Sequence, residues 1–334
     1  MSYLDFASRT ALVTFSCLSM LAAQPAHAQQ KLVFSIMAPT IQQLPAVILK
    51  VRNQEFLSPE GFATQFVTVN SCPDSVRVVA SGDANIGEIC LDTAMNAIDR
   101  GGAGIAIITA QIVTVPYELI AAPEIRTFQD LRGKKVAVAA VKTGSGLIVR
   151  KMLGSKGMAE GKDYTLIGAG FTPNRFAALK NRSVDAALLL PPFDVVLAKD
   201  GYRSVLDSTE ILGDYPFISI AVNKAWAKRN PGQVVGFLRG YSKMLTWLHN
   251  GANRDAVIEV LRSDILKNPE HGKFSADLYD KYIAKGSLYP SKLGISEKGI
   301  QAALELGQEE GQFGTPLPPV SKFIDPSFAA AAAK

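Results

Sequence analysis

The sequence has few of the residues on which most catalytic and metal sites depend. Its 334 residues include three cysteines and three histidines. The cysteines and histidines do not have the spacing of a zinc site, and there is no Gly-x-Ser-x-Gly nucleophile elbow. Cys72 and Cys90 have no histidine near them in the sequence, and His249 falls on an expected helix far from the expected ligand cleft. We therefore expect a protein that is not an enzyme, with no catalytic residue, no metal and no cofactor.

The sequence also lacks long apolar runs and blocks of like charge. Beyond the N-terminus, no segment approaches the roughly 18 apolar residues that a membrane span needs. The net charge is +5, but the lysines and arginines are scattered and form no basic stripe. This pattern disfavours binding to nucleic acid, whereas a mild positive field suits a small anionic ligand.

The first 28 residues have the pattern of a cleaved secretory signal. Arg9 precedes an apolar run from Ala11 to Ala23, and Ala26-His27-Ala28 matches the small-x-small cleavage site. These features are typical of a signal peptide that is removed during export. We expect cleavage before Gln29 and a mature protein located in the periplasm.

Two stretches of the chain, 100 residues apart, share one pattern. In the second stretch, Tyr164–Ile167 is an expected strand, Thr172-Pro173 opens a helix with Thr172 as its N-cap, and residues 185–190 form a buried strand. In the first stretch, Phe66–Val69 is the strand and Ser71-Cys72-Pro73 opens the helix; Pro73 aligns with Pro173 (173 − 73 = 100). A repeated strand–helix–strand unit predicts two similar α/β lobes.

The remaining apolar segments complete the two lobes. Further strands are expected at 32–37, 84–87, 103–110, 136–140, 202–206 and 216–222, and helices at 42–54, 147–153, 230–248, 255–266, 275–284 and 297–311. Residues 113–122 contain Pro116, which favours an edge strand or a crossover. We expect lobe 1 to comprise residues 29–116 and 214–334, and lobe 2 residues 117–213, each built on a doubly wound mixed sheet. The C-terminal helices should pack on lobe 1, and residues 315–334 should wrap over the surface.

A pairing of Cys72 with Cys90 stays open at this point. Both residues are expected just past the ends of strands in lobe 1. In a doubly wound sheet the first strand would lie between those two strands and separate them by about 9 to 10 Å, which is beyond the reach of a disulfide. A disulfide would then require the two loops to converge.

Polar groups at the ends of the expected strands are the candidate binding residues. The helix N-termini at 71–72, 143–145 and 172 offer hydroxyl and N–H groups, which favour an anion. Arg175 stands on the first turn of its helix, where it either faces water or meets a bound anion. Glu88 can accept a hydrogen bond from a ligand, whereas Asp92 is expected to cap a helix. The candidate ligand-binding residues are Thr40, Gln42, Ser71, Cys72, Glu88, Thr143, Gly144, Ser145, Thr172, Arg175, Pro192 and Tyr215.

Several motifs together carry a resemblance to a known family. They are SGDANIG at 81–87, LRGKKVAV at 131–138, FTPNRFAAL at 171–179, VDAA at 184–187 with Pro191-Pro192, and Asn230-Pro231 before Val234. From about residue 31 to the end, the chain resembles the periplasmic solute-binding proteins of ABC importers that are related to nitrate, sulfonate, taurine and thiamine-precursor binders. The resemblance implies a two-lobed α/β fold of the type II periplasmic binding class. It also implies a monomer that captures a small solute in the interlobe cleft and delivers it to a permease and ATPase complex at the membrane.

The resemblance leaves the ligand and one enzymatic alternative open. We expect a small organic anion, such as a sulfonate or an aromatic carboxylate. A neutral pyrimidine is the alternative ligand, for which Glu88, Tyr215 and Phe217 could supply a carboxylate and stacking rings. The same fold also hosts a pyrimidine synthase, whose Cys-rich motif is missing here, and an aromatic sulfinate desulfinase. An enzyme of this fold would have to act on a small aromatic or sulfur-containing substrate through Cys72 or Cys90.

Overall fold

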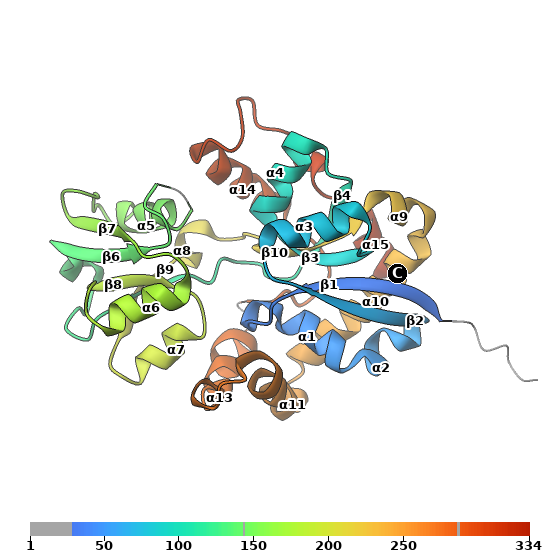
Figure 1. The fold of residues 1–334 in the computed structure, drawn as a ribbon, viewed down its shortest axis with the longest axis horizontal. Coiled ribbons are helices and arrows are strands. Elements are labelled where there is room, and N and C mark those ends of the chain that lie inside the picture. The colour runs from blue at the N-terminus through green and yellow to red at the C-terminus, as the bar shows by residue number, and fades with distance from the viewer. Residues whose placement is uncertain (1–28, 143, 286–287) are drawn as a thin grey trace, which may run out of the picture.

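The chain folds around two five-stranded sheets that lie side by side (Figure 1). The structure is a computed structural model that describes residues 29–142, 144–285 and 288–334. The expected signal peptide and Thr143 therefore lie outside the described residues. Within these ranges, no helix has the length and apolar character needed to cross a membrane.

The first sheet has the strand order β2-β1-β3-β10-β4. Its strands are β1 (Gln30–Met37), β2 (Phe62–Val69), β3 (Ile86–Cys90), β4 (Ile105–Ala110) and β10 (Ile218–Asn223). Strands β1, β2 and β3 are parallel, whereas β10 runs antiparallel to both β3 and β4. Residues of β3, β4 and β10 are buried throughout, as expected for strands covered by helices on both faces. Helices α3 (Cys72–Ser81) and α4 (Leu91–Gly101) lie on one side of this sheet, and α1 (Leu44–Val51) and α2 (Asn53–Phe56) on the other (Figure 1).

The second sheet has the strand order β7-β6-β8-β5-β9. Its strands are β5 (Glu118–Ala121), β6 (Lys134–Val138), β7 (Tyr164–Gly168), β8 (Ala186–Leu189) and β9 (Arg203–Asp207), and its helices are α5 (Ser145–Gly154), α6 (Thr172–Lys180), α7 (Phe193–Ala198) and α8 (Thr209–Leu212). In both sheets the first strand of a parallel trio lies between the other two. The two-lobed mixed α/β fold that the repeat predicts is confirmed.

The C-terminal helices pack on the core of the first sheet, as predicted. They are α9 (Lys224–Arg229), α10 (Pro231–His249), α11 (Arg254–Val260), α12 (Pro269–Gly272), α13 (Ser275–Tyr279), α14 (Glu297–Glu309) and α15 (Ser327–Ala332). Phe237 and Tyr241 on α10 are fully buried in the same core as Phe34 of β1. The tail does more than wrap the surface, because Phe323 is fully buried and Ile324 pairs with Ile107 beside β4.

Three local expectations are wrong. The helix expected at 42–54 is broken into a 3-10 turn (Ile41–Gln43), α1 and α2, because Arg52 leaves helical geometry between α1 and α2. Of the two roles that Pro116 left open, an edge strand is wrong, because β5 is an interior strand that starts only at Glu118; the segment before it is the crossover that connects the two sheets. Phe171, not Thr172, occupies the N-cap of α6, and Thr172 is the first helical residue.

Cys72 and Cys90 form a disulfide, with their Cα atoms 5.5 Å apart. Strand β1 does lie between β2 and β3, as the strand-spacing argument assumes. The argument fails because Cys72 belongs to α3, which packs against both β1 and β3, and not to the end of β2. The first turn of α3 thus returns over the sheet to Cys90, the last residue of β3.

Candidate functional site

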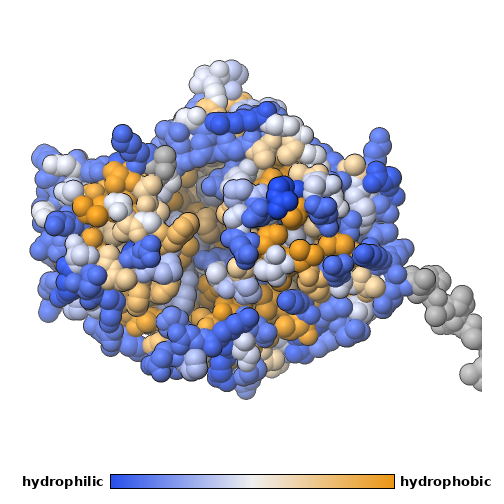
Figure 2. Space-filling view, in the orientation of Figure 1, coloured by the Kyte–Doolittle hydropathy of each residue, from blue (hydrophilic) through white to orange (hydrophobic). Residues whose placement is uncertain are grey.

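A cavity of about 120 Å³ lies between the two lobes, and Figure 2 shows the surface hollowed in this region. Both lobes, the segments that join them and α14 contribute to its walls. The lining residues are Asp92, Met95, Val115, Tyr117, Gly144, Ser145, Ile148, Tyr215, Phe217, Ala303, Leu306, Gly307, Glu310, Gln312 and Phe313. Since residues from both lobes converge here, any relative movement of the lobes changes the cavity.

The aromatic wall of the cavity comes from the two segments that connect the lobes. Tyr117 precedes β5, Phe217 precedes β10, and their rings meet edge to face with centroids 6.4 Å apart. The two connections are tied together by hydrogen bonds. The Tyr215 N–H donates to the Val113 carbonyl at 2.9 Å, and the Ser208 hydroxyl donates to the Val115 carbonyl at 2.6 Å. The rings therefore lie on the two segments that connect the lobes.

The N-terminus of α5 forms the opposite wall. Gly144 has a φ of +49°, and a Cβ at Gly146 would lie 2.2 Å from the Val141 carbonyl oxygen, so the turn needs glycine at both positions. Ser145 is buried and its hydroxyl accepts a hydrogen bond from the Ala139 N–H at 2.8 Å. The Gly144 N–H donates to a carboxylate oxygen of Glu310 at 2.6 Å. The group that was expected to hold an anionic ligand thus holds a carboxylate of the protein itself.

The cavity carries negative charge. Asp92, in the first turn of α4, and Glu310, just after α14, are its charged lining residues, and none of the lining residues is a lysine, arginine or histidine. Burial raises the pKa of Glu310, and Asp92 and Glu309 raise it further, against the lowering effect of the Gly144 N–H. Asp92 does not cap α4 as expected, because Cys90 holds the N-cap position.

Arg175 is buried and points inward, but its partners belong to lobe 2. It is 1% exposed, so of the two alternatives left open for Arg175, a position facing water does not hold. Its Nε–H donates to the Leu188 carbonyl at 2.6 Å, and its other groups donate to the Gly170 carbonyl at 2.8 Å and the Thr172 hydroxyl at 2.9 Å. Its Cζ lies 5.9 Å from the centroid of the Tyr117 ring. Burial lowers the pKa of Arg175, and Tyr117 opposes this effect.

The cavity brings together only some of the predicted site residues. Gly144, Ser145 and Tyr215 line it, whereas Thr40, Gln42, Ser71, Cys72, Glu88, Thr172, Arg175 and Pro192 do not. Thr40 and Ser71 cap the turns that follow β1 and β2. Gln42 is buried with its carbonyl bonded to Gln111, and Pro192 is the N-cap of α7.

Glu88 cannot face a ligand in this arrangement, because it is fully buried within β3. It accepts hydrogen bonds from the Met37 N–H at 2.6 Å and from the Gln111 side chain. Burial raises the pKa of Glu88 to about 8, against the lowering effect of these two donors. Its expected role as a ligand contact stays a prediction that this burial does not support.

The sequence interpretation missed Tyr117, Glu310 and the rest of the α14 contribution. One local signal could have indicated Glu310. Glu309 and Glu310 stand at the C-terminal end of a helix, where the helix dipole disfavours acidic side chains. A carboxylate that its own helix disfavours can indicate a contact with another element. Here Glu310 contacts Gly144.

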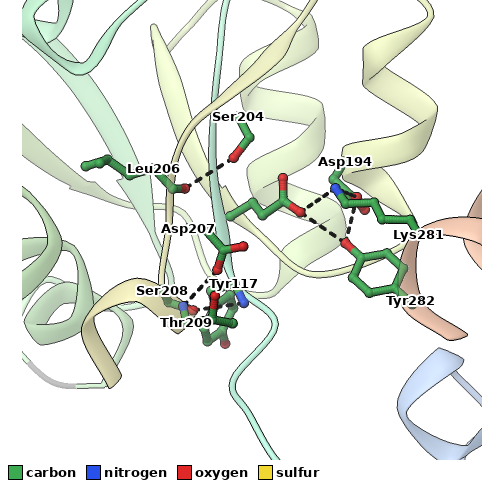
Figure 3. A network of polar contacts seen from close by, with 10 residues as sticks. Tyr117, Asp194, Ser204, Leu206, Asp207, Ser208, Thr209, Lys281 and Tyr282 are labelled. Atoms are coloured by element: carbon green, nitrogen blue, oxygen red, sulfur yellow. Dashed lines mark hydrogen bonds and ion pairs between the residues drawn. The ribbon is translucent and has the colours of Figure 1, made fainter. Parts of the chain in front are cut away.

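A second polar contact joins the lobes away from this cavity, and Figure 3 shows it. Lys281, from the segment after α13, pairs with Asp194 of α7 at 2.7 Å and with Glu118 of β5. The Tyr282 hydroxyl donates to Asp194 at 2.7 Å. Burial raises the pKa of Glu118, and Asp194 adds to this effect, whereas Lys281 lowers it.

Comparisons with known proteins agree with this architecture. A sulfonate-binding protein of a putative ABC transporter from Methylobacillus flagellatus superposes with a TM-score of 0.72 at 16% identity, over 91% of this chain and 94% of that one. The nitrate-binding protein NrtA from Synechocystis superposes with a TM-score of 0.69 at 16% identity, over 91% of this chain and 88% of that one. The ligand-binding component of an ABC-type import system from Staphylococcus aureus superposes with a TM-score of 0.69 at 14% identity, over 91% of this chain and 99% of that one.

A search of curated proteins finds no match. A family model described as NMT1/THI5 like matches residues 47–252, which is more than half of the chain. This span includes β2 to β10 and therefore most of both sheets. The chain belongs to the NMT1/THI5-like family.

Proposed function

We propose that the protein is the extracytoplasmic solute-binding component of an ABC importer. One observation carries this proposal: the enclosed cavity is built from both lobes and from the two segments that connect them. Ligand sites of open α/β sheets lie beyond the carboxyl ends of strands and often between domains. The likeness in fold to import components from three bacteria supports the proposal. In this role the protein works with a permease and ATPase complex, as a monomer, after export by residues 1–28.

The disulfide weighs against the enzymatic alternative. A cysteine nucleophile must be a free thiolate, and both Cys72 and Cys90 are taken up by their mutual bond. We therefore propose binding without turnover. Consumption of a substrate by the purified oxidised protein would contradict this part of the proposal.

The residues around the cavity bear on the class of solute. The sequence predicts a small organic anion on the basis of exposed helix N-termini and Arg175. In the structure, the Gly144 N–H already donates a hydrogen bond to Glu310. The Arg175 guanidinium already donates to backbone carbonyls. These contacts weigh against an anion and support a solute that offers hydrogen-bond donors and a flat or apolar body to Tyr117, Tyr215 and Phe217, as the neutral pyrimidine of the alternative does.

Two lobes that close around a solute give this proposal a direct test. We propose that residues 29–116 with 214–334 form one moving body and residues 117–213 the other. A thermal-shift screen of sulfonates, aromatic carboxylates, pyrimidines and amines should yield at least one stabilising compound. A compound at 100 times its Kd adds about 2.7 kcal/mol to the unfolding free energy. Small-angle scattering with that compound should report a smaller radius of gyration than without it. An unchanged profile with every compound would contradict the proposal.

A further inference from the structure

The interlobe cavity holds two carboxylates that no basic side chain compensates. Asp92 and Glu310 line it, and its lining contains no lysine, arginine or histidine. Arg175 is the cation behind one wall, but Tyr117 stands at the cavity and the Arg175 guanidinium is bonded to the Leu188 and Gly170 carbonyls. The second interlobe contact differs, since Lys281 there neutralises Glu118 and Asp194.

Glu310 is a poor partner for an anion and a good one for a cation. It already accepts the Gly144 N–H at the start of α5 and the Gln312 side-chain N–H at 2.5 Å, so neither of these donors is free for a second negative group. Its own helix gives it no compensation, because it stands at the C-terminal end of α14, where the helix dipole is negative. A bound anion would meet both this charge and that of Asp92, whereas a bound cation would be attracted by both.

The rings that complete the walls fit the same chemistry. Tyr117, Tyr215 and Phe217 present aromatic surface to the cavity, and the face of an aromatic ring attracts a cation. Tyr215 is 6% exposed, and its hydroxyl has no hydrogen-bond partner among the residues that the structure describes. The charges of Asp92 and Glu310 act on this hydroxyl. It is therefore an unpartnered polar group that a ligand can satisfy.

We propose that the solute is a small organic cation, held by Asp92 and Glu310 and enclosed by Tyr117, Tyr215 and Phe217. This inference rests on the proposed function, because it takes the interlobe cavity as the solute site. The cavity of about 120 Å³ is small, which favours a compact ammonium compound. Asp92 and Glu310 are then the residues that determine specificity for charge.

The test uses choline and its uncharged isostere, in which a carbon atom replaces the quaternary nitrogen. The two probes have the same shape and differ in charge alone. Binding to the full mature protein is measured by calorimetry at low salt. Choline should bind at least about tenfold more tightly than the isostere, a ratio that corresponds to about 1.4 kcal/mol.

Matched variants assign the charge effect to the cavity. Asp92→Asn and Glu310→Gln remove one charge each, and a glutamine oxygen can still accept the Gly144 N–H. Each should weaken choline about tenfold and leave the isostere unchanged. Glu309→Gln is the control, because Glu309 pairs with Lys151 and does not line the cavity.

Other outcomes separate the two proposals. Equal affinity for choline and the isostere, or binding of methanesulfonate or benzoate that Glu310→Gln tightens, overturns the cation inference and still places a solute in the cavity. Binding of the probes that neither Asp92→Asn nor Glu310→Gln changes contradicts the interlobe cavity as the solute site. The absence of binding by any of these probes overturns the cation inference, while the broader thermal-shift screen continues to test the proposed function.

Discussion

Two of the polar contacts between the lobes use the same residue type in opposite ways. At the α13 side, Glu118 and Asp194 are buried against Lys281, so two carboxylates share one cation. At the α14 side, Glu310 accepts hydrogen bonds from the Gly144 N–H and the Gln312 side-chain amide, has no cation as a partner, and stands near another carboxylate. A buried carboxylate needs compensation by a cation or by hydrogen bonds.

The difference separates a structural contact from a binding contact. The Lys281 contact is nearly complete without any ligand, although one Asp194 oxygen lacks a partner within the described part of the chain. The Glu310 contact differs, because both carboxylate oxygens have uncharged donors but no cation neutralises the charge beside the cavity. We infer that the first contact favours closure of the lobes and that the second makes closure depend on the solute.

Replacing Lys281 with methionine should have the largest effect on stability. The change keeps the aliphatic chain but leaves Glu118 and Asp194 buried together without a cation. Breaking a buried pair costs about 3 to 5 kcal/mol, and we expect about 3 because the Lys281 side chain is 39% exposed. Urea unfolding measures the loss, and small-angle scattering should show lobes that are further apart.

Lys285→Met provides the matched control for this change. Lys285 is exposed and lies close by in the sequence, but within the described residues it makes no ion pair. The free energy of unfolding of Lys285→Met should lie within about 0.5 kcal/mol of the wild-type value, as for most surface substitutions. Equal losses in the two variants would show that the Lys281 contact is not a specific clamp.

Replacing Arg175 tests whether this buried cation, which lies behind Tyr117, serves the fold or the solute. Arg175→Ala removes three hydrogen bonds within lobe 2 and leaves carbonyl oxygens without their donor. An unsatisfied buried group costs about 1 to 3 kcal/mol, so we expect a loss of about 2 kcal/mol in urea unfolding. Arg175→Lys should also destabilise, because a lysine cannot reproduce the planar set of donors. If Arg175→Ala kept full stability but bound an anion more weakly, Arg175 would be a ligand contact and not a structural residue.

The architecture could be predicted from the sequence because it depends on local patterns. The apolar run at 186–189 and the helix openings at Pro73 and Pro173 are properties of short segments, and each appears where expected. The face of α10 that contains Phe237 and Tyr241 is buried as its periodicity predicts. Where the prediction failed, as at β5, the cause was a proline judged without knowledge of where the strand begins.

The site could be predicted only in part because it depends on distant segments. Gly144, Ser145 and Tyr215 were found from turn chemistry and position. Glu310 lies 166 residues from Gly144 in sequence, and no local pattern links the two. The burial of Glu88 was missed for a similar reason, since β3 extends three residues beyond the expected end at Gly87.

Glu88 is another buried carboxylate, and it has only uncharged donors, so it offers a third case beside the two interlobe contacts. Its pKa is raised to about 8 in the folded protein from 4.5. A raised carboxylate pKa stabilises the fold below the unfolded value, and this contribution is lost as the pH rises through the folded value. Stability should therefore fall between pH 4.5 and about 8, by at most about 1.4 kcal/mol per pH unit.

Urea unfolding at several pH values measures this slope. Glu88→Gln has no titrating group at the position, so its stability should change less over the same range, even if the variant is less stable at every pH. Identical slopes in the two proteins would contradict the raised pKa. The difference between the two slopes measures how a buried carboxylate without a cation changes the stability of this fold with pH.

Glu310→Gln should have the smallest effect on stability, although it acts at the proposed binding contact. The amide oxygen can keep the hydrogen bond from Gly144, which loses about 1 kcal/mol when it is no longer charge-assisted. Removing the repulsion by Asp92 offsets part of this loss, since Asp92 and Glu309 both disfavour the charged form of Glu310. We expect the unfolding free energy of the ligand-free variant, measured with urea, to lie within about 1 kcal/mol of the wild-type value. Glu309→Gln, which removes an exposed pair with Lys151, should give a similarly small change. A loss as large as that in Lys281→Met would make the Glu310 contact a second structural clamp, and the distinction between the two interlobe contacts would then be wrong.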